Sequence, residues 1–209
     1  ILEEWMDPLA DNSWLRSDPI PEDRLARVSR TIAAHGLDAG SAERIARLLV
    51  AVLRHPVALP GGATVRLCEL GGADRRPETE FHWAFGQDGS PVSPGNPAAG
   101  WMVGYIDLLF RVGSVWYVLD WKTTSVDRWT REAVTESVLE HSYGLQARLY
   151  GRTVASALPA GERFGGGVVV YLRSFADPAT AEAGIHCVEP TRDGTGIDRR
   201  VRQWMHERG

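Results

Sequence analysis

Residues 104–124, GYIDLLFRVGSVWYVLDWKTT, decide the fold. Two apolar runs flank a short polar break at Val112-Gly113. This pattern predicts a hairpin of two strands, roughly 102–110 and 115–123, joined by a tight turn. Three charged residues interrupt the apolar runs, and isolated charges in an apolar setting cost several kcal/mol each unless they are paired or metal-bound. The hairpin therefore indicates a functional site as well as a pair of buried strands.

The charged residues within the two predicted strands are Asp107 in the first and Asp120 and Lys122 in the second. Side chains alternate along a strand, so Asp120 and Lys122 share a face with Val118. With a two-residue turn, Asp107 lies on that face too, diagonal to Asp120 at roughly 7–8 Å. A loop one residue longer would place Asp107 on the opposite face.

These three residues together suit metal-dependent hydrolysis of a phosphodiester. Adjacent carboxylates repel, and one of them takes up a proton unless a cation lies between them. Mg²⁺ prefers hard oxygen ligands and keeps water positions open for substrate phosphates. Lys122 is the only lysine among 23 basic residues, and a compact ammonium could orient the attacking water or neutralise charge on phosphate. The alternative is a structural Asp120–Lys122 salt bridge, with Asp107 as a turn or edge residue.

The rest of the chain predicts an α/β fold, a mixed central β-sheet with flanking helices. The expected elements are helices over 21–34 and 41–54 with Ser41 as an N-cap, an alternating strand over 78–85, a turn-rich loop over 86–100, one broken helix or two helices over 131–158, a strand over 165–175 and a closing helix over 198–208. We expect one domain, residues 1–209, divided into a mainly helical part (1–77), a core (78–175) and a C-terminal helical part (176–209). The chain begins at Ile1, and we expect it to be a piece of a longer protein.

Composition excludes several classes of protein. Cys68 and Cys187 lack the spacing of a zinc site or a disulfide framework. No apolar run approaches the roughly 20 residues of a membrane span, and a cytoplasmic location is expected. The net charge of −4 argues against a free-standing nucleic-acid binder held by general attraction to phosphate. A DNA partner would need a local site or delivery by another component.

The motifs resemble those of a known nuclease family. Asp107, followed by Asp120-Trp121-Lys122, is similar to the D…(D/E)-x-K core of the PD-(D/E)XK nuclease superfamily. The segments GYIDLLF, VWYVLDWKTT and HSYGLQARLY, with FGGGVVVYLR after them, resemble more narrowly the RecB-like nuclease domain family, which carries a Q-x-x-x-Y element after the lysine. Gln146 and Tyr150 match that element. The similarity covers roughly residues 78–175.

The resemblance implies a restriction-endonuclease-like core and a magnesium-dependent DNA nuclease, with Mn²⁺ as a possible substitute. Asp107 and Asp120 would bind the metal, Asp107, Asp120 and Lys122 would form the catalytic set, and Gln146 and Tyr150 would contact substrate. An exodeoxyribonuclease V type of activity is implied, in DNA repair and recombination, with helicase and partner subunits of a RecBCD-like complex. No membrane partner is expected.

The chain departs from the family pattern in one respect. The family's usual metal-binding histidine would fall before Ile1, and His55 and His82 are the substitutes that this sequence offers. Glu80 matches an acid often found in the family. A non-catalytic nuclease fold that binds DNA or docks a partner is an alternative, and a restriction-type endonuclease is another. Arg148 and Arg152 form an i,i+4 pair that either touches phosphate or is solvated.

Overall fold

The structure is a computed structural model of the chain, and it describes residues 2–86, 92 and 100–190. Its elements in chain order are helix α1 (Leu2–Met6), 3-10 helix η1 (Ser13–Arg16), helices α2 (Glu22–Ala33) and α3 (Ala39–Arg54), strands β1 (Pro56–Ala58) and β2 (Thr64–Arg66), 3-10 helices η2 (Leu67–Glu69) and η3 (Gly72–Asp74), strands β3 (Arg75–Phe85), β4 (Gly100–Val112) and β5 (Val115–Lys122), helices α4 (Arg131–Glu140) and α5 (Tyr143–Ala157), strand β6 (Arg163–Tyr171), 3-10 helices η4 (Leu172–Ala176) and η5 (Glu182–Gly184), and strand β7 (Ile185–Val188). In this part of the chain, no helix combines the length and apolar character needed to cross a membrane.

A mixed sheet of five strands forms the centre of the fold, in the order β3-β4-β5-β6-β7. Only the β5–β6 pair is parallel, and its crossover connection is made by α4 and α5. The other neighbours are antiparallel. Strands β1 and β2 form a separate antiparallel pair. The predicted α/β class with a mixed central sheet is confirmed.

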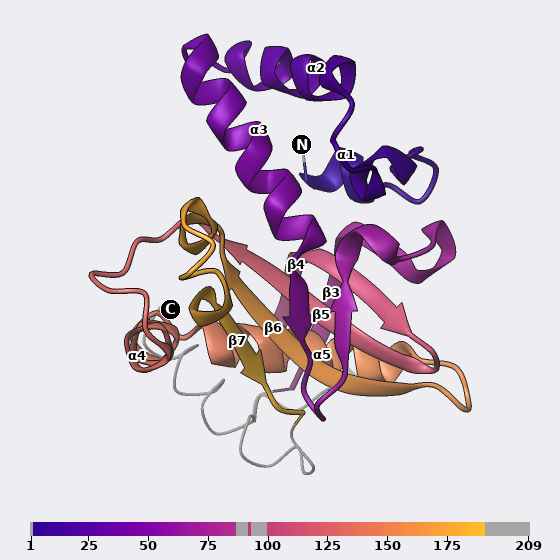
Figure 1. Ribbon diagram of the computed structural model, residues 1–209. Coiled ribbons are helices and arrows are strands. Elements are labelled where there is room, and N and C mark those ends of the chain that lie inside the picture. The colour runs from indigo at the N-terminus through magenta and orange to yellow at the C-terminus, as the bar shows by residue number, and fades with distance from the viewer. Residues whose placement is uncertain (1, 87–91, 93–99, 191–209) are drawn as a thin grey trace.

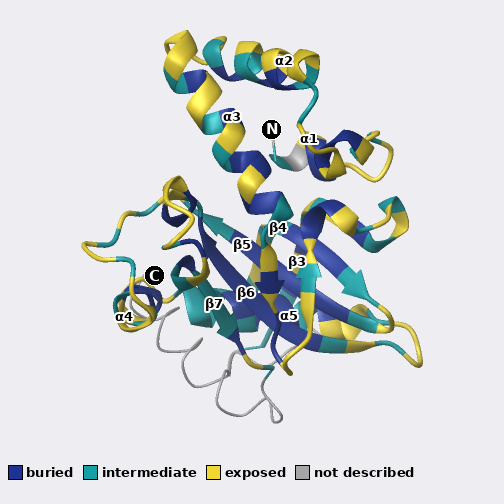
Figure 2. Ribbon diagram, in the orientation of Figure 1, coloured by how far each residue is buried: buried dark blue, intermediate teal, exposed yellow. Residues whose placement is uncertain are grey.

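Helices cover both faces of the sheet (Figure 1). On one face, α3 and the N-terminal segment pack on side chains such as Phe110 and Leu119. On the other face, α4 and α5 pack on side chains such as Val118 and Val169. Between these two layers, strands β5 and β6 are largely buried (Figure 2). A charge placed in the middle of such a sheet therefore requires a partner.

Several predicted boundaries were wrong. The N-cap of α3 is Asp38, not Ser41, because the Asp38 carboxylate accepts the backbone N–H of Ser41 at 3.0 Å. The alternating strand begins at Arg75 instead of residue 78, and β6 ends at Tyr171 where a 3-10 helix begins. Strands β1, β2 and β7 were not predicted, so the part over 1–77 is less purely helical than expected. Residues 131–158 form two helices.

Two predicted elements lie outside the described residues. These are most of the turn-rich loop over 86–100 and the whole closing helix over 198–208.

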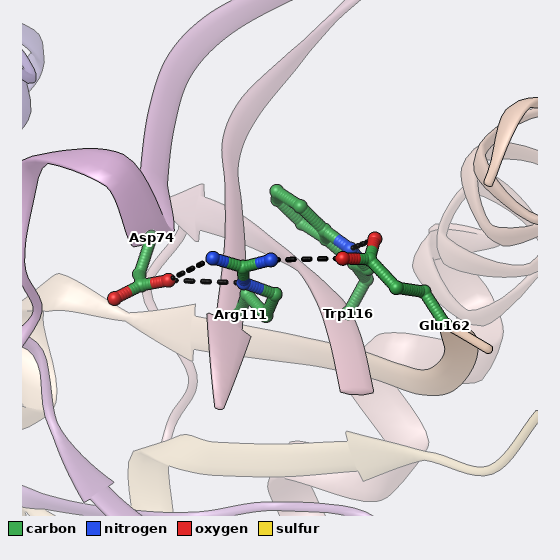
Figure 3. A network of polar contacts seen from close by, with 4 residues as sticks. All are labelled: Asp74, Arg111, Trp116 and Glu162. Carbon is green, nitrogen blue, oxygen red and sulfur yellow. Dashed lines mark hydrogen bonds and ion pairs between the residues drawn. The ribbon is translucent and has the colours of Figure 1, made fainter. Parts of the chain in front are cut away.

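A network of ion pairs joins the turn end of the β4–β5 hairpin to its surroundings (Figure 3). The Arg111 guanidinium donates from Nε and Nη2 to Asp74 Oδ1, at 2.9 and 2.7 Å, and from Nη1 to Glu162 Oε1 at 2.8 Å. The indole N–H of Trp116 donates to the same Glu162 carboxylate, and these contacts lower the pKa of Glu162. One cation thus ties β4 to the start of β3 and to the loop before β6.

The three glycines of 165–167 allow β6 to pack closely on its neighbours. The register of β5 against β6 shifts between Trp116 and Tyr117, opposite the first two of these glycines. Gly166 has a φ of +128°, and a Cβ there would lie 2.7 Å from the backbone carbonyl oxygen of Val188. This position therefore excludes every side chain for two separate reasons.

We predict that Gly166→Ala lowers the free energy of unfolding by at least ~2 kcal/mol, because the methyl group meets backbone in a conformation unfavourable for L-residues. Gly113→Ala is the matched control. Gly113 also has a positive φ, +62°, but no atom lies within 4 Å of its added Cβ, so only the conformational cost of about 1 kcal/mol is expected. Urea unfolding of both variants measures the difference, and equal losses would contradict this account of the packing.

Candidate active site

The pairing of β4 with β5 determines where the two aspartates meet. Val112 pairs with Val115, so the turn is Gly113-Ser114 and not Val112-Gly113 as predicted. The last pair of the ladder is Leu108 with Leu119. One step further, Asp107 is level with Asp120 and therefore lies directly across from it. The predicted diagonal arrangement was wrong, but the two residues are still cross-strand neighbours.

The alternation of side chains shifts at Asp107. Ile106 and Leu109 are three positions apart, yet both belong to the cluster on the α5 side of the sheet. At this shift the Asp107 carboxylate turns toward β5, where Oδ2 accepts the backbone N–H of Trp121 at 2.7 Å. The Asp107 side chain thus accepts a backbone N–H of β5 that lies beyond the last backbone pair of the two strands. The two strands separate here, and the carboxylate occupies the junction.

Lys122 contacts three groups at this junction. Its ammonium forms an ion pair with Asp120 Oδ2, and Nζ donates to Gln146 Oε1 at 3.1 Å. Nζ also lies 4.1 Å from the centroid of the Tyr143 ring, within cation–π distance. The side chains of Lys122 and Asp120 are 14% and 5% exposed. The charges are therefore held in a largely dry environment.

Helix α5 brings the predicted substrate residues to the same place. Gln146 and Tyr150 are one helical turn apart, and Gln146 Nε2 donates to the Tyr150 hydroxyl at 2.6 Å. Gln146 therefore bridges Lys122 and Tyr150, with its amide oxygen on the ammonium and its amide nitrogen on the phenol. The structure assigns Gln146 a contact with Lys122 that the sequence did not suggest.

Burial and neighbouring charges shift the pKa values of Asp120 and Tyr150 at the junction. Burial raises the pKa of Asp120 from 3.8 to about 6, the Lys122 contact lowers it, and the charge of Asp107 raises it. Asp120 Oδ2 is buried and forms an ion pair with the Lys122 ammonium. Burial also raises the pKa of Tyr150, as do the nearby charges of Asp120 and Asp107, while the hydrogen bond from Gln146 lowers it.

Two residues of the junction were missed by the sequence analysis. Glu78 contributes to the raised pKa of Tyr150 and has a φ of +46°, unusual for a non-glycine residue. Tyr143 lies against Lys122 and also shares a hydrogen bond with Thr124 at 3.0 Å. A tyrosine three residues before Gln146 on the same helix was a usable signal, because i and i+3 share a face. The positive φ of Glu78 had no sequence signal.

The other candidates have different surroundings. Glu80 pairs with His82 at 3.1 Å on the exposed part of β3. His55 ends helix α3, where its ring meets that of Phe175, and burial lowers its pKa. In the described residues no group of three or more His, Cys, Asp or Glu side chains is placed to hold a metal ion.

The donor set at the junction nevertheless fits one hard divalent cation. Mg²⁺ is commonly held by one or two carboxylates, with waters and substrate phosphates completing its octahedron. Asp107 and Asp120 supply two carboxylates side by side, close enough for the charge of Asp107 to act on Asp120. A divalent ion would also favour the ionised form of Asp120, against the effect of burial. These two aspartates are the residues that would hold it.

The fold and this junction are compatible with a nuclease-like core, and sequence comparison gives a weak similarity in the same direction. No protein-family model matches the chain. The RecBCD enzyme subunit RecB of Escherichia coli (strain K12) is 26% identical over 171 residues, covering 68% of this chain. The match covers only 14% of RecB, so the chain spans a small part of that relative. The similarity points to a nuclease or DNA-repair relationship.

We predict that Asp120→Asn stabilises the metal-free protein above pH 6. The folded pKa of about 6 is above the unfolded value of 3.8, so the folded state binds the extra proton and wild-type stability falls as pH rises from about 4 to 6. The full shift corresponds to about 3 kcal/mol, and we expect a gain of about 1–3 kcal/mol at pH 7 that is absent at pH 4.

Urea unfolding at both pH values measures this effect. Asp127→Asn, at an exposed loop position, is the control and should change stability little at either pH. A variant Asp120→Asn that is less stable than wild type at pH 7 would show that the Lys122 ion pair outweighs the burial of the carboxylate.

Proposed function

We propose that the chain is a metal-dependent DNA nuclease of the PD-(D/E)XK type that hydrolyses phosphodiester bonds with Mg²⁺, or Mn²⁺ in its place. The observation that carries the proposal is the meeting of Asp107, Asp120 and Lys122 where β4 and β5 separate. Charged groups are expensive to bury, and this arrangement concentrates three of them between two interior strands of an apolar sheet. A structural salt bridge would need only Asp120 and Lys122, so it would not explain the third charged residue, Asp107.

Each residue has a role in this proposal. Asp107 and Asp120 hold the cation, which supplies Lewis-acid stabilisation of charge on the phosphate and an activated water. Lys122 positions the attacking water or stabilises developing negative charge through its ammonium. Gln146 fixes the position of Lys122, and Tyr150 presents its hydroxyl beside the carboxylates for contact with the substrate strand.

The similarity to RecB suggests the biological setting. We propose an exodeoxyribonuclease V type of activity in recombination and the repair of double-strand breaks, in the cytoplasm and as the nuclease part of a RecB-type helicase–nuclease. Helicase and partner subunits of a RecBCD-like complex would then deliver DNA to the site. Delivery by a motor is consistent with the net charge of −4, because a broadly basic surface is then unnecessary.

We predict that the wild-type protein degrades linear DNA with Mg²⁺ and that Asp120→Ala and Lys122→Ala each lower the rate at least ~100-fold, because each removes a group that acts on the transition state. Gel assays of end-labelled DNA measure the rate. Glu80→Ala, which removes an exposed acid outside the junction, should retain activity. Equal degradation by all four proteins would remove the proposed site.

A non-catalytic nuclease fold that binds DNA or docks a partner is the second candidate. One observation favours it: the described residues offer a pair of carboxylates and no larger group of metal ligands. Metal binding separates the two candidates, since a catalytic site must hold its cation.

We predict that Mn²⁺ binds wild-type protein with one site per chain and that Asp107→Asn weakens binding at least ~10-fold, because one of the two carboxylate ligands loses its charge. Isothermal titration calorimetry measures the affinity. Asp127→Asn should bind as wild type does. Absence of a heat change that depends on Asp107 would favour the non-catalytic candidate.

A further inference from the structure

A cavity outside the candidate active site lies between helix α5 and the start of strand β6. Its volume is about 470 Å³, and three arginines line it: Arg148 and Arg152 of α5 and Arg163 of β6. We call it the arginine cavity. Arg148 follows Gln146 by two positions, about 200° around the helix. The arginine cavity and the candidate active site are thus on opposite sides of α5.

Small residues on α5 explain why this part of the helix lies so close to the sheet. A Cβ at Gly151 would lie 2.2 Å from the ring of Phe164, and one at Gly167 would lie 2.9 Å from Ala147. Ala155 continues the row of small residues along the cavity lining.

The lining carries an excess of positive charge. Two acids accompany the three arginines, Glu162 and Glu189. Glu162 already accepts from Arg111 at 2.8 Å and from Trp116, so its charge is compensated outside the cavity (Figure 3). Neither Arg148 nor Arg163 forms an ion pair with an acid of the described part of the chain. Within the described residues, these two guanidinium groups therefore have no acidic side chain as a partner.

One donor in the cavity lining lacks an acceptor. Arg148 Nε is buried and has no hydrogen-bond partner in the described residues. Buried N–H groups are almost always paired, and an unpaired one in a native structure indicates a missing water or ion. An anion that accepts from Arg148 would satisfy this group. Planar guanidinium groups pair with phosphate through two parallel hydrogen bonds, which favours phosphate over a compact halide.

We infer that the arginine cavity binds a backbone phosphate of DNA, different from the phosphate that is hydrolysed. The choice of DNA rests on the proposed nuclease function, whereas the anionic character of the ligand rests on the cavity itself. Along β6, Arg163 pairs with Val115 and Val169 pairs with Asp120. At about 3.3 Å per residue, the two levels are roughly 20 Å apart. A DNA strand bound at both the arginine cavity and the candidate active site would be held several nucleotides from the bond that is cleaved.

The test compares two triple variants in the absence of divalent metal, where cleavage cannot occur. Arg148, Arg152 and Arg163 are changed to Gln in one protein, and Arg16, Arg30 and Arg44, three exposed arginines elsewhere, are changed to Gln in the other. Both proteins lose the same charge. Fluorescence anisotropy with a labelled single-stranded oligonucleotide, repeated over a range of salt concentrations, gives affinity and salt dependence.

We predict that the cavity variant binds about tenfold or more weakly than wild type, and that the slope of log affinity against log salt falls by about 0.7 for each phosphate that the protein no longer neutralises. The control variant should change little in either quantity. Circular dichroism checks that both proteins fold. Should the triple variant unfold, Arg163→Glu at an exposed position takes its place and should weaken binding in the same direction.

Three outcomes would overturn the inference. The first is unchanged binding by the cavity variant, and the second is an equal loss of affinity in both triple variants, which would mean general attraction. The third is calorimetric binding of inorganic phosphate that depends on the three arginines, while their removal leaves the oligonucleotide affinity unchanged.

Cleavage assays keep this inference separate from the proposed function. Activity that requires Asp120, together with unchanged DNA affinity in the cavity variant, would retain the nuclease and remove the cavity site. The reverse pair of results would retain the cavity as a DNA-binding site and remove the nuclease.

Discussion

The Asp120–Lys122 ion pair lies where strands β4 and β5 stop pairing, just beyond Leu108 and Leu119. The backbone N–H released by this separation is taken by the Asp107 carboxylate, which brings the second acid to the pair. A regular ladder would leave no reason for Asp107 to turn toward β5. The candidate site therefore forms because the pairing of β4 with β5 is interrupted. The surrounding structure keeps this interruption at a fixed position along the two strands.

Two sets of contacts fix the position of this interruption. At the turn end of the hairpin, Arg111 connects Asp74 and Glu162, so the strands cannot slide past each other without breaking several charged hydrogen bonds. At the other end, Gln146 reaches from α5 to Lys122. Register in a sheet is strongly specified where both faces are buried. The apolar layers above and below the strands thus hold the charges in place as effectively as the polar contacts do.

The sequence was sufficient for the class of fold and for the identity of the main charged residues, because both follow from short-range patterns. Alternation and apolar runs predicted the hairpin, and helical spacing placed Gln146 and Tyr150 together. The exact pairing of Asp107 with Asp120 was not predictable, since it depended on whether Val112 or Ser114 joined Gly113 in the turn. The shift of alternation at Glu78 and Asp107 depends on contacts between distant strands, which no local pattern contains. The N-cap of α3 was misplaced because Asp38 and Ser41 are both good caps and only the structure shows which one accepts the hydrogen bond.

The way in which the N-terminal segment is attached affects which substitutions can be accepted there during evolution. The acceptors of the buried Arg75 side chain among the described residues are backbone carbonyl oxygens, those of Asp7, Ala10 and Leu70. Every amino acid carries the same carbonyl, so substitutions at these three positions leave the acceptors in place. The hydrogen bonds of Arg75 therefore persist when these three side chains change, and selection at this contact falls on one codon, that of the arginine.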